Sequence, residues 1–178
     1  MTTSALIVID MLNPYDHPDA GPLAAGVEHM ITPLRRLLRS AGERGDVHVL
    51  YVNDNYGDFS ADRHDLIQRA LHGKRPDLVE PIVPPDGCDL LAKIRHSIFY
   101  GTPLEYLLTR EKVGQVILTG QVTEQCVLYS ALDAYVRHFQ IKVVRDAVAH
   151  IHPELGDAAL RMMELNMRAE IVTADQCF

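Results

Sequence analysis

The sequence predicts an α/β fold in which helices cover both faces of a mostly parallel sheet of five or six strands. Short apolar runs alternate along the chain with segments of helical periodicity, and such alternation builds right-handed strand–helix–strand crossovers. The apolar runs are nearly continuous in Val, Ile and Leu, which is typical of strands buried on both faces of a parallel sheet. The expected architecture is therefore a three-layer, Rossmann-like α/β/α sandwich.

The expected strands are the apolar runs 5–9, 47–52, 115–119, 141–144 and 170–173. Apolar residues from Val27 to Ala41 follow helical spacing, and Pro33 either kinks this helix or marks its start. Further helices are expected from Thr102-Pro103, along the apolar stripe of residues 127–135, and from Pro153. The stripe expected on the last helix includes Leu155, Ala159, Met162 and Met163.

Length and composition predict a single globular domain, residues 1–178, because 47% of the 178 residues are hydrophobic and 23% are charged. The net charge of -7 repels phosphate backbones and anionic lipids, so neither a nucleic-acid nor a membrane partner is expected. The N-terminus lacks the positive region of a signal peptide, and no run reaches the ~20 apolar residues of a membrane span. We therefore expect a soluble, cytoplasmic protein. Its three cysteines, at 88, 126 and 177, form neither a disulfide framework nor a zinc pattern.

Ligands of parallel sheets bind beyond the carboxyl ends of the strands, so the residue after each strand is a candidate. Asp10 directly follows the run 5–9, although a carboxylate there could also cap a turn. Cys126 ends the strand-to-helix segment 119–126. A helix N-terminus and a nearby cation would lower the pKa of its thiol, although Cys126 could also be a small packing residue. Lys93 is not informative alone, but a carboxylate, an ammonium and a thiol can activate one another at one sheet edge.

The chain resembles the isochorismatase-like cysteine hydrolases, which include nicotinamidases and N-carbamoylsarcosine amidases. No single motif is specific to this family, but the order and spacing of the motifs are. Together the motifs extend over nearly the whole chain. The motifs are Leu6–Met11, Lys93 with Ser97–Phe99 and Thr102–Leu104, Leu118–Gly120 with Thr123, Cys126–Val127, Asp133–Ala134 and Val143–Ala147.

This resemblance implies a catalytic triad of Asp10, Lys93 and Cys126. It also implies a cis peptide bond between Gln121 and Val122, which would aim the backbone N–H groups of Val122 and Cys126 at one point as an oxyanion hole. In the implied mechanism Asp10 takes the thiol proton, Lys93 stabilises the charges, and the thiolate attacks a carbonyl carbon. Water then hydrolyses the thioester, with Asp10 again as the base.

The chain departs from some of these relatives in two ways. The cysteine argues against true isochorismatase activity on a vinyl ether, because enzymes with that activity lack it. Metal-dependent nicotinamidases carry ligands after the second strand, where this chain has Asn53 and Asn55. We therefore expect no metal and no cofactor. A displaced metal site could be built only from Asp62, His64 and His72.

The expected function is hydrolysis of a C–N bond in a small amide, carbamoyl compound, ureide or lactam. A thiol-based sensor, a non-catalytic binding module on the same fold, and a metal-dependent nicotinamidase are the alternatives. The resemblance implies a homo-oligomer, a dimer or a tetramer. The residues expected to line the substrate pocket are Asn53, Tyr56, Phe59, Phe99, Tyr100 and Gln121.

Overall fold

The centre of the molecule is one parallel sheet, seen in the computed structural model, which describes residues 3–178. Within these residues the sheet has six strands in the order β3-β2-β1-β4-β5-β6, and every neighbouring pair is parallel. The predicted fold class is thus confirmed. The strands are β1 (Thr3–Ile9), β2 (Val47–Asp54), β3 (Asp89–Lys93), β4 (Val113–Gln121), β5 (Gln140–Ala149) and β6 (Glu170–Val172).

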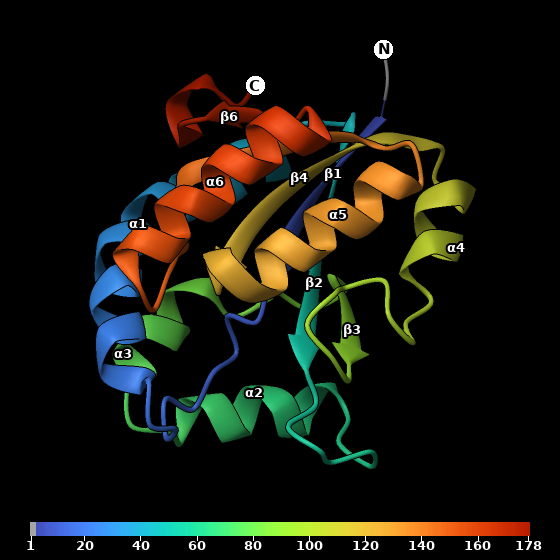
Figure 1. Cartoon of the computed structure of the whole chain (residues 1–178). Helices are drawn as coiled ribbons and strands as arrows, with labels where there is room; N and C mark the ends of the chain where they lie inside the picture. The colour runs from blue at the N-terminus through green and yellow to red at the C-terminus, as the bar shows by residue number, and fades with distance from the viewer. Residues whose placement is uncertain (1–2) are drawn as a thin grey trace.

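Helices cover both faces of this sheet (Figure 1). On one face lie α1 (Ala20–Gly42) and α3 (Pro76–Val79), followed by a short 3-10 helix (Glu80–Ile82). On the other face lie α4 (Leu104–Arg110), α5 (Leu128–Val136) and α6 (Pro153–Met167). A π-helical turn (Thr123–Val127) precedes α5, and a 3-10 helix (Ala174–Gln176) follows β6. None of the helices in the described part of the chain combines the length and apolarity needed to cross a bilayer.

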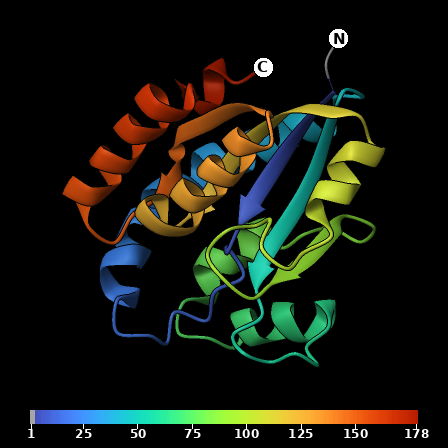
Figure 2. The same cartoon turned by 45° about the vertical axis from the view of Figure 1, so that its right-hand side comes forward.

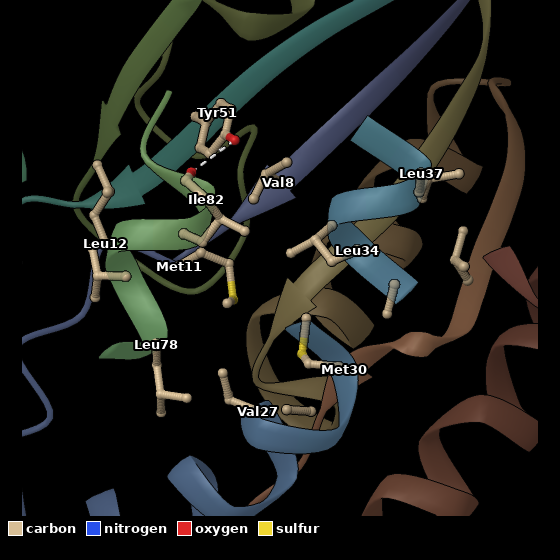
Figure 3. Packing of buried hydrophobic residues seen from close by; sticks show 14 of the residues in the cluster. Val8, Met11, Leu12, Val27, Met30, Leu34, Leu37, Tyr51, Leu78 and Ile82 are labelled. Carbon is tan, nitrogen blue, oxygen red and sulfur yellow. Dashed lines mark hydrogen bonds between the residues drawn. The ribbon is translucent and has the colours of Figure 1, made fainter. Parts of the chain in front are cut away.

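The β1 strand shows why the apolar runs are continuous. Successive side chains of a strand point to opposite faces of the sheet. Accordingly, Leu6 and Val8 pack into the cluster beneath α1, whereas Ile7 and Ile9 pack into the cluster beneath α4, α5 and α6. Figure 3 shows Val8 facing the side chains of α1, and the Tyr51 hydroxyl donating a 2.9 Å hydrogen bond to the carbonyl oxygen of Ile82.

Three local expectations differ from the structure. The strand β3 was not predicted, because its five residues include only three apolar ones. Helix α1 begins at Ala20 and continues through Pro33, so the alternative in which Pro33 marks the start of the helix is wrong. Of the four residues expected in the buried apolar stripe of α6, Ala159 and Met163 are buried, but Leu155 and Met162 are exposed.

The parallel order brings the carboxyl ends of β3, β2, β1 and β4 to one edge of the sheet. The helix α2 (Arg63–Leu71) lies beyond the arrowheads of β1 and β2, whereas the start of β1 and the C-terminus lie toward the opposite edge (Figure 2). Polar residues end or follow each of these four strands: Lys93, Asp54, Asp10 and Gln121. The edge below the arrowheads is therefore the place to look for chemistry.

Candidate active site

The three residues of the predicted triad lie together at this edge. The ammonium nitrogen of Lys93, at the end of β3, is 2.9 Å from Oδ2 of Asp10 and 3.6 Å from Sγ of Cys126. The Cys126 thiol and the Asp10 carboxylate also lie close enough to shift each other's pKa. The groups meet because Asp10 follows β1 and Cys126 lies in the turn after β4, the strand beside β1.

Two hydrogen bonds hold Asp10 in place, one to its carboxylate and one to its backbone carbonyl. Asp10 lies in the left-handed region with φ 53, its Oδ1 accepts a 2.8 Å hydrogen bond from the Asp54 backbone N–H, and its carbonyl accepts one of 2.7 Å from Nε2 of Gln121. Gly120 makes this close packing possible, because its φ is 104 and a Cβ there would lie 2.1 Å from the carbonyl oxygen of Ile9. The site thus depends on a glycine as well as on its charged groups.

Lys93 is a buried cation between acidic groups. Its side chain is 1% exposed, its ammonium lies 3.5 Å from Oδ2 of Asp54, and it donates a 3.0 Å hydrogen bond to the carbonyl of Arg95. Burial lowers the pKa of Lys93, but the negative charge of Asp10 and the neighbouring groups outweighs this and leaves the pKa above its ordinary value. Lys93 therefore carries a positive charge at neutral pH.

Burial also decides the resting proton positions of the other two groups. It raises the pKa of Asp10, and the ammonium of Lys93 offsets the rise only in part. Burial, together with the charge of Asp10, raises the pKa of the Cys126 thiol far above its ordinary value. We expected the helix start and a cation to lower this pKa. Desolvation and the carboxylate outweigh them, so the resting sulfur is a thiol next to a strengthened base.

The chain turns sharply around Cys126. Residues 123–127 form the π-helical turn, and the peptide bond between Gln121 and Val122 is cis. The carbonyl of Val122 accepts hydrogen bonds from the N–H groups of Gln125 and Val127. The Val122 backbone also lies close enough to Cys126 to lower the pKa of its thiol, although burial outweighs this effect.

Two side chains at the site escaped the sequence reasoning. Asp54 contacts Lys93 and, through its backbone, Asp10; its position at the end of β2 could have indicated it. His96 places Nδ1 3.7 Å from Sγ of Cys126, and its ring lies 5.4 Å from the ring of Tyr129 on α5. No periodicity marks His96, because it lies in the irregular segment after β3.

The six residues expected to line a pocket have different surroundings. Asn53 holds the loop after β1, because its side chain exchanges two hydrogen bonds with the backbone of Leu12. The Tyr56 hydroxyl donates to the same carbonyl. Gln121 is buried against Asp10 and Tyr15. These contacts fix the backbone around the site.

The three remaining aromatic residues do not form one surface. Phe59 is 81% exposed and Tyr100 is 59% exposed. The Phe99 ring is buried against Phe139 and lies under the guanidinium of Arg137. Phe99 is therefore packed into the core on the α4–α5 side of the sheet.

The candidate metal ligands do not converge. Asp62 caps α2 by accepting the backbone N–H of Asp65, and Nδ1 of His72 contacts the carbonyl of Gln68 one turn away. His64 is exposed on the first turn of the same helix. Among residues 3–178 no group of three or more His, Cys, Asp or Glu side chains is arranged to hold a metal ion.

A separate surface cavity of about 520 Å³ lies on the α1 side of the sheet. Its wall includes Cys88, Arg39 and Tyr51 but none of the triad residues. Its size alone does not make it the reaction site, because it brings no base or acid to the Cys88 thiol.

A parallel α/β fold that gathers a carboxylate, an ammonium and a thiol at its carboxyl edge has the parts of a hydrolase site. The chain belongs to the isochorismatase family, since residues 4–176 match the Isochorismatase domain.

Three similar proteins illustrate the relationship. An uncharacterized isochorismatase family protein of Bacillus subtilis, YaaI, is 35% identical over 172 residues, which are 97% of this chain and 94% of that protein. The maleamate amidohydrolase of Pseudomonas putida is 29% identical over 88% of this chain and 76% of its own length. The crystal structure of an N-carbamoylsarcosine amidase from Thermoplasma acidophilum superposes with a TM-score of 0.77 at 27% identity, covering 98% of both chains.

Proposed function

We propose that the protein hydrolyses a C–N bond of a small amide-like substrate through a thioester on Cys126. The observation that carries this proposal is the position of the Lys93 ammonium, within 2.9 Å of the Asp10 carboxylate and 3.6 Å of the Cys126 sulfur. The names of two similar proteins, a maleamate amidohydrolase and an N-carbamoylsarcosine amidase, support an amide as the substrate class.

Acylation begins with transfer of the thiol proton from Cys126 to Asp10. The raised pKa of Asp10 makes this carboxylate a stronger base than an exposed one, and the Lys93 ammonium stabilises the thiolate that forms. The sulfur attacks the carbonyl carbon, and the backbone N–H groups of Val122 and Cys126 stabilise the oxyanion. As the C–N bond breaks, Asp10 returns its proton to the leaving nitrogen. A thioester and an ionised Asp10 remain, and water completes the hydrolysis.

The test is ammonia or amine release from a panel of small amides, N-carbamoyl compounds, ureides and lactams. Replacing Cys126 by Ala should abolish release, because no other thiol lies at the triad. Cys88→Ala and Cys177→Ala are the matched controls and should leave turnover largely intact. Substantial activity in Cys126→Ala would contradict nucleophilic catalysis.

The alternatives have less support. The amide groups of Asn53 and Asn55 are engaged by the backbone, and the carboxylate of Asp62 caps a helix, which does not favour a metal-dependent nicotinamidase. A redox-sensing cysteine is usually exposed and of low pKa. Cys126 is 8% exposed, and the pKa of its thiol is raised.

We also propose that the protein works as a homo-oligomer in the cytoplasm. Tyr129, Leu132 and Val136 are exposed on α5 at helical spacing, an apolar stripe that a second copy could cover. Cys88, Cys126 and Cys177 are free thiols, as expected in a reducing compartment. Light scattering tests the assembly: a monomer mass across a wide concentration range would contradict it.

A further inference from the structure

His96 is a basic group beside the reacting sulfur that the acylation step does not use. Its Nδ1 lies 3.7 Å from Sγ of Cys126, on a side chain that is exposed to solvent. Asp10 and Lys93, in contrast, are buried. The sulfur therefore lies between a buried acid–base pair and an imidazole that water can reach.

Asp10 and Lys93 face the sulfur from the buried side of the site. After acylation Asp10 is again a carboxylate, its Oδ1 accepts the Asp54 N–H at 2.8 Å, and its Oδ2 pairs with Lys93 at 2.9 Å. A water that hydrolyses the thioester must approach the carbonyl carbon bound to Sγ. Nδ1 lies 3.7 Å from Sγ, about twice the length of a C–S bond, so a water that approaches this carbon from the solvent side can hydrogen-bond to the imidazole.

The geometry points to His96 as the base that activates the hydrolytic water, a role that rests on the proposed thioester mechanism. The ring of Tyr129 packs against the His96 ring and supports its orientation. With its own proton on Nε2, the imidazole has a free electron pair on Nδ1 to receive another.

The step balances without any further reactant. The water O–H bond breaks, its proton binds to Nδ1, and the oxygen forms a bond to the carbonyl carbon. The C–S bond then breaks, and the sulfur leaves with the bonding electron pair. The imidazolium returns its proton across the 3.7 Å contact to Sγ, which restores the thiol and the neutral imidazole.

The test uses p-nitrophenyl acetate, whose leaving group needs no acid, so that acylation and deacylation separate into a burst and a slow phase of p-nitrophenolate release. In His96→Asn the burst rate should stay within about threefold of wild type while the slow phase falls about 10²-fold, a typical loss for a general base. The acetyl group should accumulate on Cys126, as seen by peptide mass mapping. Hydroxylamine, which attacks thioesters without a base, should restore the slow phase.

Two further variants separate chemistry from packing. His96→Phe keeps a ring against Tyr129 and should behave like His96→Asn. His29→Asn changes an exposed histidine of α1 and should change neither phase. A burst rate that falls as much as the slow phase, or a slow phase that does not change, would overturn the role of His96. The absence of an acetyl group on Cys126 in wild type and variant alike would instead sink the proposed thioester mechanism.

Discussion

The Lys93 ammonium and the Asp10 carboxylate form an ion pair of 2.9 Å in which neither side chain is more than marginally exposed. Such a pair contributes little net stability compared with apolar residues, but removing one partner leaves an uncompensated buried charge. The pair therefore fits the proposed catalytic role better than a purely stabilising one, and the fold requires both partners. The first prediction follows from it.

Replacing Lys93 by Met should lower the free energy of unfolding at neutral pH by about 3 kcal/mol, as is typical when one partner of a buried pair is removed. Activity should fall as well, since the thiolate loses its cation. Urea denaturation measures the first effect. Lys74→Met, at an exposed lysine, should stay within about 0.5 kcal/mol of wild type.

The stability lost in Lys93→Met should become smaller as the pH falls. Burial raises the pKa of Asp10 in the folded protein above 3.8, its ordinary value. Protonated Asp10 therefore stabilises the folded state below about pH 3.8, and this stabilisation is lost as the pH rises through the pKa of Asp10 in the folded protein. Without Lys93 the pKa of Asp10 should rise further. The stability deficit of Lys93→Met should therefore shrink toward about pH 4. A deficit that grows on acidification would contradict this assignment.

Replacing Asp10 by Asn should move two reactions of Cys126 in opposite directions. The negative charge of Asp10 raises the pKa of the thiol, so its removal should speed alkylation of Cys126 by iodoacetamide about tenfold at about pH 8. Amide hydrolysis should fall by about 10²–10⁴-fold, because both the base and the acid are lost. Mass mapping distinguishes Cys126 from Cys88 and Cys177. Asp175→Asn, at an exposed carboxylate near Arg36, is the control. Slower alkylation in Asp10→Asn would refute the electrostatic account.

Replacing Gly120 by Ala should damage both the fold and the site. The new methyl group would meet the carbonyl oxygen of Ile9 at 2.1 Å, at a φ of 104 that side chains rarely adopt. We expect a loss of about 3 kcal/mol or more in unfolding free energy, with a matching drop in folded protein. Gly45→Ala faces open space and should be close to neutral. A stable Gly120→Ala protein would show that β1 and β4 can separate at this edge.

Treatment with EDTA should leave amide hydrolysis unchanged. The candidate metal ligands do not converge, since Asp62 caps α2, His72 contacts Gln68, and Asn53 holds Leu12. The measurement is kcat/KM before and after chelation and dialysis. Loss of activity that zinc or iron restores would revive the metal-dependent alternative.

The sequence predicted the parallel strands, but it did not predict which side chains at the ends of those strands face the site. The continuous apolar runs indicated parallel strands, because both faces of β1 are buried. The same double burial hides which of two neighbouring residues faces the site. Asn53 and Asp54 end the same strand, yet Asn53 holds the loop at Leu12 while Asp54 contacts Lys93. Only the folded register assigns those directions.

The direction of the pKa shift of the Cys126 thiol was not predicted from the sequence either. A cysteine near a helix start beside a lysine suggests a lowered thiol pKa, and the family resemblance brought Asp10, Lys93 and Cys126 into one hypothesis. Burial of the sulfur and the adjacent carboxylate reverse the direction of the shift. How deeply a group is buried depends on the whole fold rather than on its neighbours in sequence.

The most direct test of the account is to trap the acyl-enzyme. Wild-type protein mixed with the best amide of the panel should be quenched in acid within the first turnover and digested. We expect an added acyl mass on the peptide that carries Cys126, removable by hydroxylamine and absent from Cys88 and Cys177. Two results together would contradict the thioester mechanism: Cys126 stays unmodified at every quench time while the amide is hydrolysed, and the Cys126→Ala protein keeps its activity.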